Sequence, residues 1–363
     1  IINTGNVFWK LYGNLVKFWV LDRLFIVTKD VEFFEQLLVH PKQLRKSILY
    51  NTIKPWLGTG LLLSEGTKWH TRRKIITPTF HFRILEQFVE VFDRQSTVLV
   101  NCLSEKADGR TTFDVMPYIG AATLDIITES AMGVNVHAQT DKSMPYVMAI
   151  DRSEDIREEV DTFMFEGHDT TTTVFSFALY LVSRHPEVQK MLLSEMYTIF
   201  GETNVEPFTM AKLNELKYME CVLKETFRLY PVAPVIGREI IEDFHYNHSR
   251  LGDVIIPQST QVFISIYHLL RDPLYYDNPS EFIPVDRHKD ASIKNPFTYI
   301  PFRAGPRNCI GQRYAMLEIM LCKIREYELL PFGQDVEPVI GIILRSETVV
   351  GITKLSVSVG ERN

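Results

Sequence analysis

Hydrophobic positions along the chain recur with two periods, one typical of strands and one typical of helices. Residues 16–20 and 24–28 are rich in β-branched and aromatic side chains, which predicts two strands near the start. Apolar residues at helical spacing, bounded by Gly or Pro, predict helices at about residues 83–106, 118–133 and 153–184. Because the helical period prevails, the pattern predicts a mainly α protein with a small β lobe.

The second half of the chain continues this mixture. Residues 209–231 are predicted to be helical, and an irregular stretch rich in Pro, Asp and Asn covers residues 272–302. A helix from about residue 311 to 330 and a strand at 337–346 follow. No repeat or low-complexity linker interrupts the sequence, so residues 1–363 are expected to form a single domain.

Composition narrows the classes of function. The chain is 45% hydrophobic and 23% charged, as in packed globular proteins. The net charge of -6 and the lack of a basic stripe with interleaved aromatic residues argue against nucleic-acid binding. The four cysteines lie far apart without a CxxC pair, so neither a disulfide framework nor a zinc site is expected. The longest apolar run, at 174–182, is far shorter than the ~20 residues that span a bilayer.

A single cysteine stands in the loop "PFRAGPRNCIGQRYAM" at residues 301–316. Gly305 and Gly311 on either side of Cys309 permit a flat ligand to approach the main chain. The helix that begins near Gly311 points its positive end at the cysteine, which is expected to lower the thiol pKa and favour the thiolate that an iron ion requires. The alternative is a structural cysteine in an ordinary turn.

The whole pattern is more specific than its parts. Phe302-x-x-Gly305-x-Arg307-x-Cys309-x-Gly311 resembles the haem-binding loop of the cytochrome P450 family. The likeness runs from about Leu11 to Leu355 and is strongest to the fatty-acid omega-hydroxylase branch, including its insect relatives. It implies the cytochrome P450 fold and bound haem b, with Cys309 as the iron ligand. Residues expected around this cofactor are Phe302, Arg307 and Gly311.

The predicted long helix contains "EVDTFMFEGHDTTTT" at residues 159–173. Asp169 and Thr170 place an acid and a hydroxyl side by side, and Gly167 thins the helix wall beside them. The resemblance implies that this pair relays protons to iron-bound dioxygen; threonines that bond back to the preceding turn are the alternative. Glu166 lies among apolar residues, which is costly for an unpaired carboxylate. The resemblance implies an ester between Glu166 and a haem methyl group, and a surface ion pair is the alternative.

The family resemblance, and not the residues alone, implies roles for further side chains. Glu225 and Arg228, three residues apart on a helix, would form a buried structural triad with Arg287, which stands one position later than the family spacing. Trp69, Arg73 and Arg238 would contact the haem propionates, whose carboxylates suit the guanidinium fork. For Trp69 and Arg73 the alternative is a plain basic helix face.

Two segments typical of the family are not found in this sequence. The sequence is expected to be truncated at its start, before the family's N-terminal membrane helix and hinge, and the helical block that roofs the substrate pocket is expected to be deleted near residues 150–153. The family likeness still implies a monooxygenase that inserts one oxygen atom of dioxygen into a small apolar substrate, such as a fatty acid or related lipid. Electrons would come from NADPH through a flavoprotein reductase, at the cytoplasmic face of the endoplasmic reticulum membrane.

Other classes of function stay open. A short isoform could bind haem without turnover, or a fragment lacking its roof could fail to fold stably. A thiolate-haem isomerase is disfavoured by Asp169 and Thr170, because an isomerase needs no proton relay to dioxygen.

Overall fold

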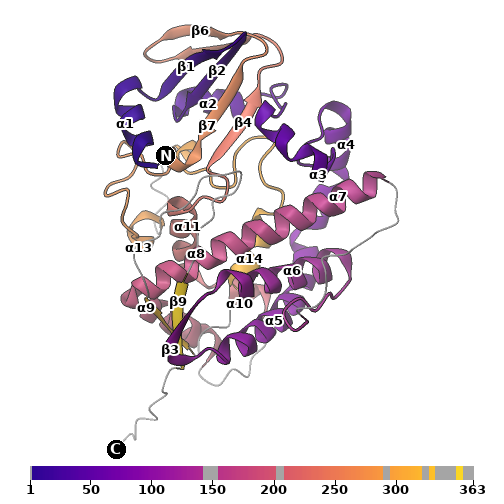
Figure 1. Ribbon diagram of the computed structural model, residues 1–363, viewed down its shortest axis with the longest axis vertical. Helices are drawn as coiled ribbons and strands as arrows, with labels where there is room; N and C mark the ends of the chain where they lie inside the picture. The colour runs from indigo at the N-terminus through magenta and orange to yellow at the C-terminus, as the bar shows by residue number, and fades with distance from the viewer. Residues whose placement is uncertain are drawn as a thin grey trace, which may run out of the picture.

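The computed structural model describes residues 2–141, 154–201, 208–288, 295–320, 327–331 and 349–354. A sheet-containing lobe lies at one end, and the larger remainder is built of helices, with the long α7–α8 run crossing its centre (Figure 1). This mainly α architecture with a small β lobe confirms the predicted fold class. The expected junction at 150–153 and the predicted strand at 337–346 lie outside the described residues.

The β lobe is organised around a four-stranded sheet in the order β1-β2-β7-β4. Its strands are β1 (Leu15–Val20), β2 (Arg23–Thr28), β7 (Gln261–Ser265) and β4 (Val235–Glu239). β2 and β7 run parallel with Val27 opposite Phe263, and the other pairs are antiparallel. The two strands predicted near the start are therefore confirmed as β1 and β2.

Helix α2 (Val31–Val39) packs against this lobe. Asp30 caps it by accepting a hydrogen bond from the Phe33 amide at 3.2 Å, which satisfies one of the free N–H groups of the first turn. Phe33 and Phe34 of α2 are fully buried together with apolar residues of β2, β4 and β7. The hairpin of β5 (Phe244–His248) and β6 (Gly252–Ile256) covers the same core.

The helical part holds the larger core. Its helices include α5 (Phe82–Ser104), α6 (Met116–Met132), α7 (Glu154–Met164), α8 (Thr170–Arg184), α9 (Pro186–Phe200), α11 (Lys217–Leu229) and α14 (Gln312–Met320). The other α-helices of the described residues are α1 (Ile2–Tyr12), α3 (Lys54–Leu57), α4 (Gly66–Ile76), α10 (Met210–Leu213), α12 (Ile266–Leu269) and α13 (Pro284–His288). A second sheet joins β3 (Asp108–Asp114), β9 (Val349–Lys354) and β8 (Tyr327–Pro331).

Several sequence predictions of local structure are wrong. Residues 327–331 form β8 instead of continuing the predicted last helix, and the sequence pattern predicts no element for the residues that form α1. The predicted helix at 209–231 is interrupted between α10 and α11. The predicted helix at 153–184 is present, but a π-helical turn at Phe165–Asp169 separates α7 from α8. Such turns add one residue to a helix and are frequent at functional sites.

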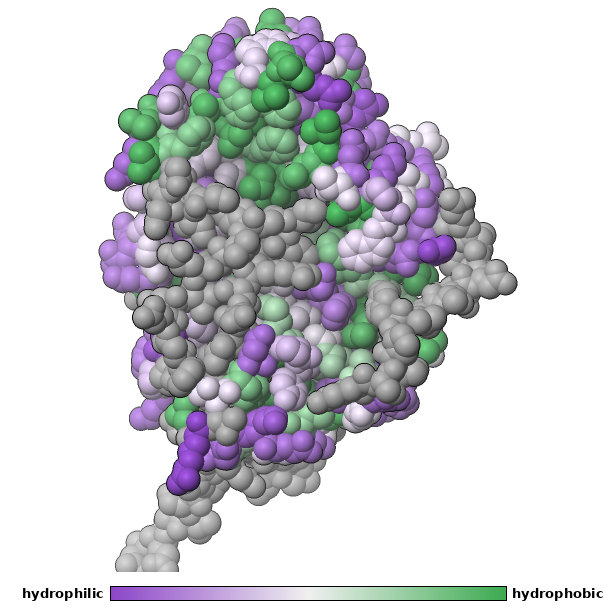
Figure 2. All heavy atoms as spheres, viewed as in Figure 1, coloured by the Kyte–Doolittle hydropathy of each residue, from purple (hydrophilic) through white to green (hydrophobic). Residues whose placement is uncertain are grey.

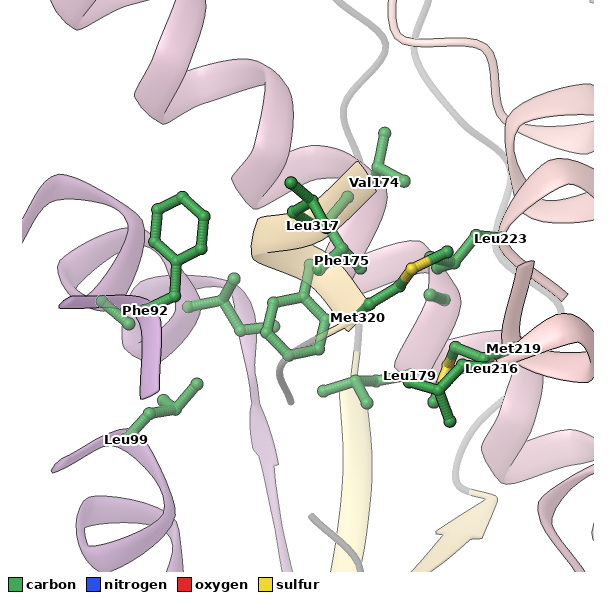
Figure 3. Close-up of a cluster of buried hydrophobic side chains, with 14 of the residues drawn as sticks. Phe92, Leu99, Val174, Phe175, Leu179, Leu216, Met219, Leu223, Leu317 and Met320 are labelled. Atoms are coloured by element: carbon green, nitrogen blue, oxygen red, sulfur yellow. The ribbon is translucent and has the colours of Figure 1, made fainter. Parts of the chain in front are cut away.

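Helix α8 lies at the centre of the helical core. Phe175 and Leu179 of α8, Met219 and Leu223 of α11 and Met320 of α14 belong to one cluster of buried side chains (Figure 3). Residues 171–183 are all buried. Burial of several large apolar side chains at roughly 1.5–3 kcal/mol each fixes these three helices relative to one another. The same three helices carry the candidate site.

Candidate cofactor site

The loop that carries Cys309 is held by its own backbone and by α2. The Cys309 amide donates to the Phe302 carbonyl at 2.9 Å, and the Asn308 amide donates to the Gly305 carbonyl at 3.0 Å. Gly305 has φ +73°, and a β-carbon there would overlap the carbonyl oxygen of Leu38 at the end of α2. The expectation that Gly305 makes room for a ligand is therefore wrong, because protein backbone occupies that space.

Gly311 does leave room beside the sulfur. A β-carbon on Gly311 would lie 4.0 Å from the Cys309 Sγ and 3.8 Å from the Phe80 ring, an ordinary contact distance. Both glycine and cysteine line a cavity of ≈ 140 Å³ between the loop and the π-helical turn. The predicted site residues that line this cavity are Trp69, Arg73, Glu166, Thr170, Phe302, Arg307, Cys309 and Gly311. Asp169 and Arg238 are not among the described residues that line it.

The free thiol of Cys309 is not activated as the sequence predicts. Burial and the nearby Glu166 carboxylate raise the pKa of Cys309 to about 11. Arg303, the Gly311 amide and Arg73 act in the opposite direction but do not prevail. The prediction of a lowered thiol pKa is wrong because it considered the helix end and neglected burial. A coordinated metal ion removes the proton from a thiol, so Cys309 remains suited to bind iron.

The π-helical turn brings Glu166 and Thr170 to the cavity wall. The Thr170 hydroxyl donates to the Glu166 carbonyl, and the Thr173 hydroxyl donates to the Asp169 carbonyl at 2.8 Å. Threonine hydroxyls thus bond back to the preceding turn, as the alternative interpretation holds. The Asp169 carboxylate lies 3.6 Å from the His168 ring. Gly167 lines the cavity and also lets α6 approach, since a β-carbon there would meet Ile127 at 2.7 Å.

Buried and half-buried cations surround the cavity. Arg73 donates to the Asn308 carbonyl and side chain, at 3.0 and 2.9 Å. Arg307 stacks 4.2 Å above the Trp69 ring and donates to the Ser64 carbonyl at 2.6 Å. Burial and neighbouring Arg238 lower the pKa of Arg307 to about 9. Buried cations gather at such density where an anion is bound.

Arg238 lies behind these residues in β4. It is buried, and burial lowers its pKa to about 10. Its Nη1 donates to the carbonyl of neighbouring Gly237 at 3.1 Å.

Sequence reasoning missed two members of this cluster, Lys46 and Arg303, which both line the cavity. Burial and the neighbouring arginines hold the pKa of Lys46 well below its usual range, and Glu166 opposes them. Arg303 has φ +66° within the cysteine loop. Arg303 is visible in the quoted motif, whereas Lys46 gives no local signal. Together with Arg73, Arg238 and Arg307 they form a group of five basic side chains. Among the described residues that line the cavity, Glu166 is the one carboxylate, so basic side chains outnumber acidic ones. The site therefore suits a ligand with several carboxylates, such as a porphyrin.

A second ion-pair network braces the helix that backs the site. Arg228 is fully buried and donates to Glu225 at 2.8 and 2.9 Å. The Arg287 Nε lies 3.4 Å from the Glu225 carboxylate, and the His288 ring bonds that carboxylate at 2.9 Å. The structure therefore brings Glu225, Arg228 and Arg287 together and adds His288. Tyr299, just before the cysteine loop, donates to the Lys224 carbonyl at 2.8 Å and links the network to that loop.

Two acidic residues that the sequence analysis does not single out, one on α7 and one on α14, position the cavity walls. Glu158 accepts from the Thr59 amide at 2.6 Å and pairs with Arg72 at 3.2 Å, which holds the segment leading to Leu61. On α14, Glu318 is buried and lies 3.4 Å from the Thr171 hydroxyl. Burial raises the pKa of Glu318 well above its usual range.

A half-buried thiol just before the first turn of a helix, faced by clustered cations and a π-helical turn, defines a haem-thiolate site. The Cytochrome P450 family model matches residues 5–153 and 152–340, and the chain belongs to this family of haem b monooxygenases. Cytochrome P450 4d8 of Drosophila melanogaster is 42% identical over 441 aligned residues, covering 96% of this chain and 95% of the relative. Cytochrome P450 4V2 of Homo sapiens is 35% identical, covering 86% of this chain and 76% of the relative. Both relatives carry the number 4 in their names, which here denotes family 4, and they confirm the predicted family and its predicted branch.

The comparisons also bear on the expected internal deletion. The two matched segments meet at residues 152–153, where the sequence predicts that a helical block is missing. The alignment with Cytochrome P450 4d8 is 441 residues long, whereas this chain has 363 residues. The relative therefore carries residues that this chain lacks.

Proposed function

We propose that this monooxygenase hydroxylates fatty acids or related lipids, with preference for the end of the chain. The observation that carries the proposal is that Glu166 and Cys309 face one cavity whose remaining wall is largely apolar, with Phe163, Val174 and Ala233 among its members. Such a wall suits a hydrocarbon chain. The likeness to family-4 relatives supports the same class of substrate.

The residues of the cavity would divide the work of holding the cofactor. Bound haem supplies activation of dioxygen, with electrons delivered from NADPH by a flavoprotein reductase. Cys309 would provide the axial thiolate, and Arg73, Arg307, Lys46 and Arg303 would neutralise the propionates. Trp69 would support Arg307 through its 4.2 Å stacking contact. Arg238, buried behind them, would add positive charge.

Glu166 would fix the cofactor through an ester bond. Its carboxylate lines the cavity and would hold the cofactor through a methyl group of the haem. A tethered cofactor holds the pocket rigid, which favours oxidation at a chain end over oxidation at neighbouring carbons. Asp169 and Thr170 would deliver protons, and for this the Thr170 hydroxyl must leave the Glu166 carbonyl to which it donates. The π-helical turn weakens the regular helical bonding there.

The ratio of terminal to internal products tests the role of Glu166. We expect the wild-type protein to favour the terminal alcohol and Glu166→Ala to shift toward internal alcohols, measured by mass spectrometry with a medium-chain fatty acid. Glu166→Gln, which keeps the side-chain shape, controls for lost packing. Mass analysis of the extracted cofactor reports the ester directly. Equal product ratios in the three proteins would contradict the proposal.

The surface of the β lobe supports placement at the endoplasmic reticulum membrane. Large apolar side chains are exposed on α1 and at the β1–β2 turn, including Leu11 (69%), Trp19 (65%) and Leu21 (95%). Figure 2 shows apolar residues gathered on this end of the molecule. None of the helices in the described residues is long and apolar enough to cross a bilayer. Flotation with phospholipid vesicles, compared with Trp19→Ser/Leu21→Ser, tests this placement; equal flotation of both proteins would contradict it.

A haem-binding protein with impaired turnover is the second candidate, favoured by the break in the family match at 152–153. A roof excludes water from the site, which monooxygenation needs. The carbon monoxide difference spectrum of the reduced protein separates the cases. A strongly red-shifted Soret band with lipid products supports the enzyme. The same band with peroxide release and no product supports the second candidate.

A further inference from the structure

A second, smaller cavity lies between α8, α9 and α11, and one residue each of α14 and β8 also lines it. Its volume is ≈ 70 Å³. Apart from Gln189, its lining side chains are all apolar, among them Ala178, Leu192 and Val222. Four more lining residues are Phe175 and Leu179 of α8 and Met219 and Leu223 of α11, which Figure 3 labels.

This cavity borders the cofactor cavity along three helices, α8, α11 and α14. On α8, Val174 lines the cofactor cavity and Ala178 the second one; on α11, Phe227 and Leu223 stand in the same relation. Four residues correspond to about one turn, or roughly 6 Å along the axis. On α14 a single side chain, Ile319, lines both cavities. Ile319 is thus a shared wall between the two spaces.

The chemistry of the lining decides what the cavity can hold. One water needs only about 10–15 Å³, but it also needs two to four polar partners. The single polar lining side chain, Gln189, already accepts a hydrogen bond from the Leu329 amide at 2.9 Å through its Oε1. Apolar cavities of this kind stay dry and take up apolar molecules. The occupant must therefore be apolar and no larger than a few atoms.

We propose that this cavity is a docking site for small apolar gas molecules, dioxygen first among them, which exchange with the cofactor cavity past Ile319. Dioxygen fits because it is apolar and small, and because the family to which the chain belongs consumes it. Exchange needs a rotation of the Ile319 side chain and no movement of the backbone. Uptake of gas rests on the cavity alone, whereas its use in catalysis rests on the monooxygenase function.

Xenon is the probe, because it is apolar, monatomic and readily detected. The haem-loaded protein is titrated with dissolved xenon and followed by 129Xe NMR, and crystals pressurised with xenon locate the atom. We expect xenon between α8 and α11 in the wild-type protein. Ala178→Leu should abolish this site by filling it, and Val222→Leu, which adds one methylene, should weaken it. Leu99→Met on α5, also buried but outside the cavity, should leave xenon binding unchanged.

Flash photolysis of the carbon monoxide complex tests the connection past Ile319. Carbon monoxide that is released from the iron and reaches the second cavity rebinds more slowly than carbon monoxide that stays beside the iron. Filling the second cavity with xenon should therefore reduce the slow phase of geminate recombination. Ile319→Ala should enlarge that slow part, and Ala178→Leu should remove it. Absence of xenon from the cavity of the folded wild-type protein, or xenon bound there without any effect on recombination, overturns the proposal. Neither readout requires substrate turnover, so failure of the proposed hydroxylation would be seen separately.

Discussion

Arg73 donates two hydrogen bonds to Asn308, one to its carbonyl at 3.0 Å and one to its Oδ1 at 2.9 Å. Asn308 immediately precedes Cys309, so Arg73 ties α4 to the residue beside the thiol. Arg73 therefore has a structural role on the loop in addition to the propionate contact predicted from the sequence.

Replacing Arg73 should separate these roles. Arg73→Ala is expected to lower the free energy of unfolding by about 1–3 kcal/mol, because hydrogen bonds to a charged group are lost, and to lower haem retention. Arg73→Lys keeps the charge but not the paired bonds, so it should recover part of the haem binding and little of the stability. Urea denaturation and the ratio of Soret to protein absorbance measure the two effects. Lys74→Ala, at an exposed neighbour, is the control and should change neither.

Gly305 should resist substitution for a reason that Gly252 does not share. Both have positive φ, +73° and +72°, but only Gly305 faces backbone, the Leu38 carbonyl. Gly252→Ala should cost about 1–2 kcal/mol from the left-handed conformation alone. Gly305→Ala should cost clearly more and displace the cysteine loop, with loss of the thiolate Soret band. Equal costs for the two variants, measured by chemical denaturation, would show that the approach to Leu38 is not tight.

Glu158 should make stability depend on acid pH. Burial opposes ionisation, but hydrogen bonds from Thr59, Lys68 and Arg72 lower the pKa of Glu158 from 4.5 to about 2. Below pH 4.5 the unfolded state therefore binds more protons than the folded state, and the stability from this group is lost as pH falls toward 2. Glu158→Gln should cost about 1–3 kcal/mol at pH 7, and the difference from wild type should shrink between pH 4.5 and 2. Glu90→Gln, on an exposed face of α5, should show no such trend.

Glu318 should have the opposite dependence. Burial holds its pKa well above the usual range, so the folded state keeps a proton that the unfolded state loses above about pH 4.5. Stability from this group is complete below that pH and falls as pH rises through the folded-state pKa. Glu318→Gln should therefore be more stable than wild type at pH 8, and the advantage should narrow at pH 5. A constant difference across this range in urea midpoints would show that Glu318 does not titrate with unfolding.

Predictions that depend on neighbouring residues in the sequence are confirmed, whereas features that depend on contacts between distant segments were missed or wrong. β1 and β2 follow from short runs of β-branched and aromatic residues, and the cysteine loop follows from a local motif. Lys46, by contrast, is buried against Arg238 and Arg303, which lie about 190 and 260 positions later in the chain, so no local signal marks it. The thiol pKa was mispredicted for the same reason, since burial by distant segments outweighs the helix end.

The π-helical turn illustrates a different limit. One extra residue in a helix leaves no trace in composition or in a short apolar pattern, so the sequence predicts a single helix across residues 153–184. In the structure the turn sits between Glu158, which grips the 59–61 segment, and Thr170 on the cavity wall. The extra residue of the π-helical turn therefore determines how the side chains of α7 are oriented relative to those of α8, and the hydrophobic pattern does not reveal it.

The number of residues in the π-helical turn fixes the rotation of α7 relative to α8 about the helix axis. A residue advances an α-helix by about 100°, so deleting one residue from Phe165–Asp169 would restore a regular helix and turn α7 by that angle about its axis. Glu158 and Glu159 would then point away from the backbone amides of Thr59 and Leu61. The segment that forms the far wall of the cavity would lose its anchor although no wall residue had changed. In this chain, length within one turn is as strictly constrained as the identity of Cys309.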